Sequence, residues 1–119
     1  MAELVISEKS GSADLVPIAL AVNQILGLPV TLRSIGSPGV RVEGGKVLDE
    51  EYSGPVLEDV MKSGMPVRTV PKSGVYEGVP VSVAPIKDQD GRVIAAMGIV
   101  DVVGTIDIPA VFGAYTEVV

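Results

Sequence analysis

The sequence has no cysteine, no histidine and no tryptophan among its 119 residues. Without cysteine the chain has no disulfide, no thiolate nucleophile and no cysteine-bound zinc or iron–sulfur cluster. Without histidine it also lacks the usual base at neutral pH and the commonest ligand of transition metals. No pair of acids with catalytic spacing takes their place. The sequence therefore favours a non-catalytic protein, and we predict no cofactor and no metal site.

Basic surface and long hydrophobic runs are also scarce. The net charge is −6 and the pI is near 4.5, whereas binding to a nucleic acid backbone needs a basic face. The longest apolar stretch, residues 15–26, is about a dozen residues long and contains a proline, which is shorter than the roughly 20 residues that span a bilayer. No basic segment precedes an apolar run at the N-terminus. These features predict a cytoplasmic protein without a nucleic acid or membrane partner.

Aromatic residues make up only 3% of the chain, although hydrophobic residues make up 47%. The core is therefore aliphatic. At this length we expect a single domain, residues 1–119. The high mean hydropathy, +0.47, predicts spare apolar surface, which a homodimer would cover.

Residues 78–101 are the most informative stretch, because they read as two long strands joined by a tight turn. The turn at residues 88–91 suits a type I turn closed by a left-handed glycine. The predicted register places Asp88 opposite Arg92 and Val83 opposite Met97. Alternation then gives one bulky core face and a second face with small residues at its centre, including Ala96 and Gly98. A helix, a second subunit or a bound small molecule could cover that second face, and a helix or a subunit is favoured.

The remaining elements follow from turn residues and periodicity. Residues 3–7 fit a short strand, and a helix capped by Ser12 or Asp14 continues through residue 26. This helix is apolar almost all round, which predicts burial on every side, and Pro17 should lie in its first turn. Further strands are expected at residues 30–35, 40–43, 46–48 and 67–70, and a short helix at residues 56–62. Residues 106–119 fit either a short helix from Pro109 or an edge strand.

This order of elements predicts the α+β class, with a central antiparallel sheet of about five strands and helices packed on it. Both strands of the long hairpin are apolar on both faces. We therefore expect them to be central strands of a sheet that is covered on both sides.

Two segments carry a family resemblance. LPVTLRSIGSPGVRVEGGKVLDEEYSGPVLEDV (residues 28–60) and GVYEGVPVSVAPIKDQDGRVIAAMGIVD (residues 74–101) together resemble an uncharacterised family of small proteins from methanogenic archaea. That resemblance implies an origin and no activity. The hairpin at residues 85–92, PIKDQDGR, is similar to the last strands of PAS, GAF and Cache sensor domains and other profilin-like folds, which implies a sensor-like sheet.

Asp101 is the sharpest single candidate for a binding residue. It ends the apolar strand of the long hairpin and points to the bulky side. The resemblance to Cache-like sensors implies that Asp101 holds the amine of a ligand. The alternative is that its carboxylate caps the turn that follows, and this alternative is favoured.

Two arginines and three acids offer further possibilities. Arg33 and Arg41 flank a loop with Gly36, Ser37 and Gly39, which could hold an anion, but arginines paired with Glu43 or Asp49 are the favoured interpretation. Residues 49–51 are all acidic and could suggest a divalent cation site. Because these acids are consecutive, their side chains point in different directions. Acids just before a helix are also favoured by the helix dipole alone.

Tyr52 and Tyr76 lie in loops near glycine, where a tyrosine serves either at the mouth of a pocket or as a lid on the core. From these features we predict a dimeric, non-catalytic, PAS- or GAF-like module that binds a small anionic or amino-acid-like ligand. The expected ligand contacts are Asp101, Tyr76, Arg33 and Arg68. Two alternatives stay open: an assembly protein that binds partners without a ligand, and a small enzyme that uses carboxylates to act on an acidic metabolite.

Overall fold

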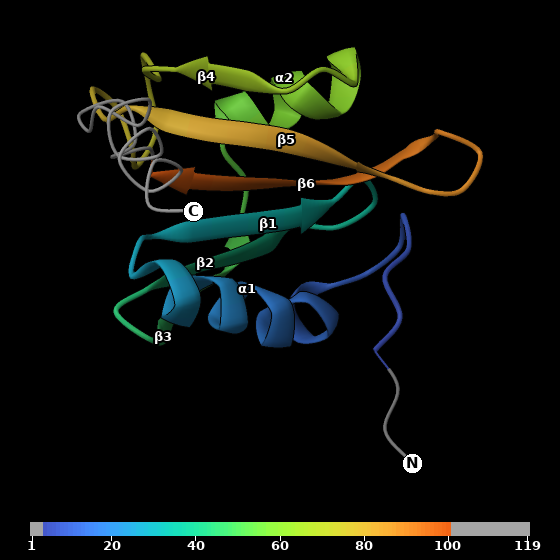
Figure 1. Cartoon of the computed structure of the whole chain (residues 1–119), viewed down its shortest axis with the longest axis horizontal. Coiled ribbons are helices and arrows are strands. Elements are labelled where there is room, and N and C mark those ends of the chain that lie inside the picture. Colours follow the sequence, from blue (N-terminus) through green and yellow to red (C-terminus); the bar gives the residue numbers. More distant parts are fainter. Residues whose placement is uncertain (1–3, 101–119) are drawn as a thin grey trace, which may run out of the picture.

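The computed structural model describes residues 4–100, which form a six-stranded antiparallel sheet and two helices (Figure 1). The α+β class and the antiparallel sheet are as predicted, with six strands in place of about five. Along the sheet the strand order is β3-β2-β1-β6-β5-β4. In chain order the elements are α1 (Ser12–Leu26), β1 (Val30–Ser34), β2 (Gly39–Glu43), β3 (Lys46–Tyr52), α2 (Pro55–Ser63), β4 (Val67–Thr69), β5 (Val81–Lys87) and β6 (Val93–Val100).

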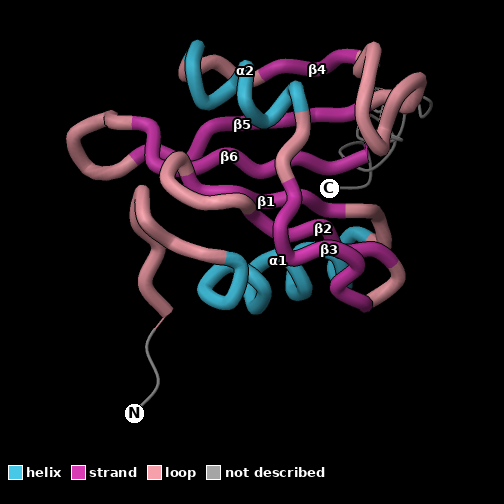
Figure 2. Tube along the Cα trace, turned by 180° about the vertical axis from the view of Figure 1, so that it is seen from behind, coloured by secondary structure: helices cyan, strands magenta, loops and turns pink. Residues whose placement is uncertain are grey.

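The two helices cover opposite faces of the sheet, and each covers only half of its face. Helix α1 packs on β1, β2 and β3, whereas α2 packs on β5 and β6. Figure 1 shows α1 in front of the sheet, and the view from behind in Figure 2 brings α2 to the front. We call these the α1 face and the α2 face. The sheet is thus covered on both sides, as predicted, but only over diagonally opposite halves.

Each helix closes its own hydrophobic core. The core on the α1 face is fully buried and consists of Leu15, Ala19, Val30, Leu32, Val40 and Val42. The core on the α2 face consists of Tyr52, Leu57, Val60, Val81, Val83 and Ala96. Alternation along β1 explains the division, because Val30 and Leu32 point to one face while Thr31 and Arg33 point to the other.

The turn of the β5–β6 hairpin forms as the sequence predicts. The Asp88 N–H donates to the Arg92 carbonyl at 2.9 Å, and Gly91 has a φ of +82°. The predicted register farther along the strands is wrong, because Val83 lies opposite Gly98 and not Met97. A bulge in β6 causes the shift: Lys87 pairs with Val93 and Ile86 pairs with Ala95.

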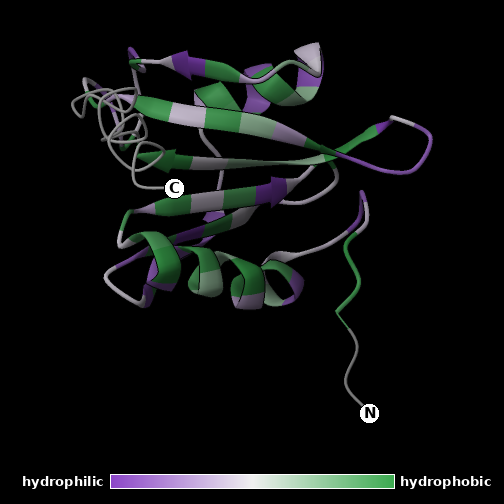
Figure 3. Ribbon diagram, in the orientation of Figure 1, coloured by the Kyte–Doolittle hydropathy of each residue, from purple (hydrophilic) through white to green (hydrophobic). Residues whose placement is uncertain are grey.

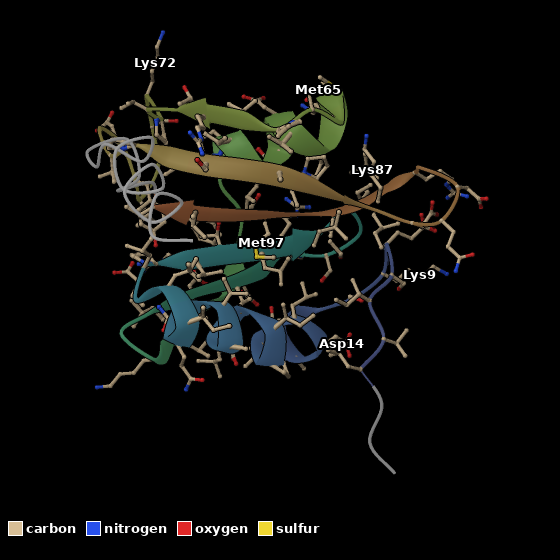
Figure 4. All side chains as sticks on the ribbon, in the orientation of Figure 1. Lys9, Asp14, Met65, Lys72, Lys87 and Met97 are labelled. Carbon is tan, nitrogen blue, oxygen red and sulfur yellow. The ribbon has the colours of Figure 1, made fainter. Side chains whose placement is uncertain are left out.

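This bulge changes which residues share a face. Val81 and Val83 now lie on the α2 face with the small residues Ala96 and Gly98. Met97, labelled in Figure 4, turns to the α1 face and packs at the edge of that core. The small-residue side of β6 therefore meets valines of the neighbouring strand and α2, which agrees with the expected helix.

Helix α1 ends at the predicted residue, but its N-cap is Gly11 and not Ser12 or Asp14, and its surroundings also differ from the prediction. The Asp14 carboxylate accepts the Gly11 N–H at 3.0 Å, and Gly27 ends the helix in the left-handed region. Pro17 lies in the second turn and not in the first, so it cannot donate the usual backbone hydrogen bond to the Ala13 carbonyl. Only Leu15, Ala19 and Asn23 are buried. The helix is therefore exposed on its outer side, and the prediction of burial on every side is wrong for the single chain.

The buried Asn23 side chain ties α1 to two loops. Its amide nitrogen donates to the Leu28 carbonyl at 2.7 Å, and its oxygen accepts the Gly45 N–H at 2.8 Å. Because Gly44 and Gly45 form the turn between β2 and β3, this residue holds that hairpin against the C-terminus of the helix.

The expected first strand does not form, since residues 4–7 have no regular structure. They are followed by a turn in which the Glu8 carbonyl accepts the Gly36 N–H at 2.8 Å. In residues 4–100 neither helix has the length and hydrophobicity needed to cross a bilayer. Asp101 and residues 106–119, on which the sequence also makes predictions, lie outside the described residues.

Candidate functional site

A recess opens between α2 and the sheet on the α2 face, and we call it the α2 recess. Its enclosed part measures about 30 Å³, and with the open mouth it measures about 380 Å³. The enclosed part alone has room for about two water molecules. Its walls are contributed by β1, the end of β3, β5, β6, the start of α2 and the β4–β5 loop: Pro29, Thr31, Tyr52, Gly54, Pro55, Val56, Leu57, Pro71, Ser73, Tyr76, Val81, Val83, Gly98, Ile99 and Val100.

Two glycines give the recess its shape. A Cβ on Gly54 would lie 2.6 Å from the Tyr52 hydroxyl oxygen, so the absence of a side chain lets the tyrosine tip pass over the start of α2. A Cβ on Gly98 would lie 2.9 Å from the Thr31 hydroxyl oxygen and 3.0 Å from a Val83 methyl group. Both glycines therefore allow a close approach that any larger residue would crowd.

A polar cluster of Arg41, Glu43 and Tyr76 borders the recess. Tyr76 lines the recess, and its hydroxyl donates to Glu43 Oε2 at 2.8 Å. Arg41 Nη1 donates to the same carboxylate oxygen at 2.6 Å. In the sheet Arg41 lies directly opposite Thr31, another residue of the recess wall. Arg41 and Glu43 are two positions apart on β2, so they share the α2 face.

The polar cluster leaves one donor unused. Arg41 Nε is buried and has no hydrogen-bond partner in the described part of the chain. A buried N–H without a partner costs free energy. Such a group therefore points to a water molecule or a ligand that accepts the bond.

Burial holds the tyrosines of the site in their neutral form. Burial, and then the hydrogen bond to Glu43, raise the pKa of Tyr76 far above its ordinary value of 10.0, although Arg41 acts in the opposite direction. Burial also raises the pKa of Tyr52. Both phenols therefore act as hydrogen-bonding groups at neutral pH and not as bases.

The groups around the recess are suited to binding a small molecule. The recess has apolar walls, aromatic rings, several hydroxyl groups and an arginine–glutamate pair at one border. Groups of this kind orient a small molecule by its polar end while its body fills the apolar part. Within residues 4–100 the structure contains no group of three acids that could hold a metal ion.

The structure separates the predicted ligand contacts. Tyr76 lies in the wall of the α2 recess. Arg33 lies on the same face but outside the wall, where its Nη1 donates to the Ser53 hydroxyl at 2.6 Å and lies 3.4 Å from Glu58 Oε1. Arg68 lies on the α1 face, opposite Ser82 in the sheet. Asp101 follows the wall residue Val100 and lies outside the described residues, so its role stays a prediction.

Sequence reasoning ranked Arg41 below Arg33. It favoured the pairing with Glu43, and that pairing is present at 2.6 Å. It gave no sign of the unused Nε, because that depends on how closely Tyr76 and the neighbouring strands pack around the guanidinium group. A signal did exist: opposite charges at positions 41 and 43 of one strand face the same side, toward a loop that carries a tyrosine. The acids of residues 49–51 contribute only a local bond, from the Glu51 N–H to Asp49 Oδ1 at 2.8 Å.

Comparison with known proteins places the recess inside a shared region. Residues 22–103 match the model of a family described as an uncharacterized protein conserved in archaea (DUF2111). An uncharacterized protein of Methanocaldococcus jannaschii is 48% identical over 100 residues, which cover 83% of this chain and 76% of that protein. No solved structure matches the chain. The family match contains all six strands, α2 and every residue of the recess wall.

Proposed function

This chain belongs to an uncharacterized protein family conserved in archaea, and we propose that it is a non-catalytic module that binds a small organic acid in the α2 recess. Amino acids are included in this ligand class. We further propose that the protein works in the cytoplasm as a sensor.

The observation that carries this proposal is the unused donor of Arg41. Its Nε is buried and has no hydrogen-bond partner among the described residues. Arg41 adjoins the recess through two wall residues: Thr31 lies opposite it in the sheet, and Tyr76 donates to the same Glu43 oxygen. A carboxylate oxygen is a strong acceptor for an arginine N–H. A ligand with such an oxygen would remove the cost of the unpaired group.

The form of the recess supports a small ligand with an apolar body. Valines 81 and 83, Leu57 and three prolines line it, and its interior of about 30 Å³ leaves the body of a small ligand partly in the open mouth. Arg41 is the cation of the polar cluster and its Nε has no partner in the described part of the chain, so a carboxylate of the ligand is best placed next to Arg41. The Glu43 carboxylate would suit the amine of an amino acid.

The sheet also supports a sensor-like architecture. A central antiparallel sheet with a long terminal hairpin is similar to PAS, GAF and other profilin-like domains, and such domains bind small molecules against the sheet. We extend that similarity to this family as part of the proposal. Fold alone does not define the ligand.

Native mass spectrometry of the gently purified chain is the first test, because a retained ligand adds a defined mass. Titration calorimetry with acetate, isobutyrate, alanine and valine then tests the ligand class directly. We expect at least one of these probes to bind, and Arg41→Gln to weaken that binding about tenfold, which corresponds to about 1.4 kcal/mol.

The matched control is Arg92→Gln. It removes the same charge from an exposed arginine of the β5–β6 turn that pairs with Glu8 at 3.2 Å, so binding should not change. A chain that retains no small molecule and binds none of the four probes would contradict the proposal. Equal affinities of the wild type and Arg41→Gln would remove Arg41 from the site.

A further inference from the structure

Access of a ligand to Arg41 requires part of the structure to move. Arg41 Nε is buried, and a buried atom cannot be reached from solvent while its neighbours stay in place. The enclosed part of the α2 recess has room for only about two water molecules. If Arg41 binds a ligand, as the proposed function on which this step rests requires, one of the surrounding elements must open to admit it.

Most of the surrounding elements are fixed by pairing or by packing. Strand β2, which carries Arg41, is paired on both sides, and β5 and β6 are also paired on both sides. Figure 3 shows β5 and β6 as largely hydrophobic strands. Helix α2 is anchored by Leu57 and Val60, which are buried in the core on the α2 face. Moving any of these elements would break sheet hydrogen bonds or expose core side chains.

The β4–β5 loop, residues 70–80, is the exception. It contributes Pro71, Ser73 and Tyr76 to the wall of the recess. Pro71 is buried, whereas residues 72–75 are exposed, and the Lys72 side chain points away from the molecule (Figure 4). A segment with so few buried side chains is among the least costly to displace.

Hydrogen bonds within the loop give it a shape of its own. The Gly78 N–H donates to the Pro71 carbonyl at 3.0 Å, and the Val79 N–H donates to the Tyr76 carbonyl at 2.9 Å. Among the described residues, one hydrogen bond joins the middle of the loop to another element: the Tyr76 hydroxyl donates to Glu43 on β2 at 2.8 Å. The loop is thus a compact unit of the Ω-loop kind, and a single side-chain bond ties it to β2.

Two glycines flank Tyr76 within the loop. Gly74 has a φ of +86° and Gly78 has a φ of +78°. A Cβ on Gly78 would meet no atom within 4 Å, so the backbone conformation and not tight packing calls for glycine there. Because a hinge is a short stretch of loop residues that absorbs a large change in φ and ψ, these two positions are suited to turn the segment that carries Tyr76.

We propose that the β4–β5 loop is a lid on the α2 recess and that the hydrogen bond from Tyr76 to Glu43 is its latch. In the open state Tyr76 leaves Glu43, the loop turns about Gly74 and Gly78, and a carboxylate reaches Arg41. In the closed state the loop covers the part of the ligand that lies in the mouth and keeps water from it. The latch uses the same Glu43 oxygen to which Arg41 Nη1 donates, so the lid and the donor for the ligand share one carboxylate.

NMR relaxation dispersion on the ligand-free chain tests whether the loop opens. We expect the amides of Gly74, Tyr76 and Gly78 to exchange with a minor state on the microsecond-to-millisecond timescale of loop opening. Tyr76→Phe removes the latch and keeps the ring. It should raise the population of the minor state about fivefold, because one hydrogen bond of ordinary net strength is lost from the closed state.

Binding kinetics test whether this opening admits the ligand. NMR line shapes, recorded with whichever of acetate, isobutyrate, alanine and valine binds most tightly, give the rates of association and dissociation. Without the latch both rates should rise about fivefold, and the affinity should stay within about twofold of the wild type. A Tyr76 that only contacts the ligand would change the dissociation rate and leave the association rate as it is.

The matched control is Tyr52→Phe. It removes the hydroxyl of the other tyrosine in the recess wall, but Tyr52 belongs to β3 and not to the loop. The minor-state population and the association rate should therefore equal those of the wild type. Circular dichroism of both variants checks that they are folded.

Two results would overturn the lid even if a probe binds at Arg41. One is the absence of exchange at the loop amides in both the wild type and Tyr76→Phe. The other is an association rate that Tyr76→Phe leaves unchanged. Failure of all four probes to bind contradicts the proposed function instead, and the relaxation measurement then still decides whether the loop opens.

Discussion

The two faces of this sheet are finished differently, although each is covered by one helix. In sequence each helix is followed by three strands: α1 by β1, β2 and β3, and α2 by β4, β5 and β6. On the α1 side every member of the core is 0% exposed. On the α2 side the core residues border a recess, and a polar cluster with an unused arginine donor lies beside it.

The two cores therefore differ in composition and in how completely they are closed. The α1 core is closed by aliphatic side chains alone, and such packing contributes stability without chemistry. The α2 core includes Tyr52 and adjoins Tyr76, Arg41 and Glu43. Its cavity and its unpaired donor both cost free energy. That these costs fall on the α2 face supports the proposal of a binding site there.

The largest effect should come from truncating the closed core. Leu32→Ala removes a fully buried side chain from the α1 core, and we expect a loss of about 2–5 kcal/mol in the free energy of unfolding. Leu57→Ala is the matched change beside the recess, where one side of the leucine already borders empty space. It should cost roughly 1 kcal/mol less than Leu32→Ala because fewer contacts are lost. Urea unfolding of both variants measures the difference, and a larger cost for Leu57→Ala would contradict the comparison.

A smaller but sharper effect should come from enlarging a valine in each half. Val81→Leu adds a methylene to the wall of the recess, where there is space for it, so stability should stay within about 0.5 kcal/mol of the wild type or rise. Val30→Leu adds the same group to the closed α1 core and should cost about 1–3 kcal/mol. Thermal and urea unfolding report both changes. Equal costs at the two positions would show that the recess is closed in solution.

The smallest effect concerns the hydrogen bond between Tyr76 and Glu43. Tyr76→Phe should cost about 1 kcal/mol at pH 7, because the phenol is only partly buried. Folding raises the pKa of Tyr76 above the 10.0 of the unfolded chain. The stabilisation from this phenol is therefore complete below pH 10 and is lost as the pH rises through the higher pKa of the folded state.

The stability gap between the wild type and Tyr76→Phe should accordingly narrow as the pH rises above 10. Urea unfolding at several pH values measures this gap, and the phenylalanine variant serves as its own control for the titration of lysines. A gap that stays constant across that range would mean that the phenol is not held by burial and by Glu43.

Local sequence signals predicted most of the elements. The turn at Asp88, the glycine pair between β2 and β3, and the proline at the start of α2 each specify a backbone geometry by themselves. The face assignment in β6 failed for a tertiary reason. The bulge lies at Ile94, whose carbonyl accepts the Ile35 N–H at 3.0 Å. That partner is a residue far away in the sequence, so the hairpin alone does not reveal it.

The candidate site was predicted less well for a similar reason. From sequence Tyr76 fits either the mouth of a pocket or a lid on the core, and the structure places it in the wall of the recess, while its contact with a ligand stays a prediction. The recess itself depends on how α2 docks over β5 and β6, and the unused donor of Arg41 depends on its packing. Arg68 and Arg33 look alike in sequence, yet strand pairing sends them to opposite faces of the sheet.

The pairing of β1 with β6 also has a consequence for the order of folding. Within each half, helix and strands are close in sequence and their contacts can form early. The pairing between the halves joins Val30 to Ile99, which lie far apart in the sequence, and closing so long a loop carries a larger entropic cost. We therefore expect the two halves to form first and the pairing of β1 with β6 to form last. During that interval the edges of β1 and β6 are unpaired, and the nascent chain is most exposed to aggregation at these two strands.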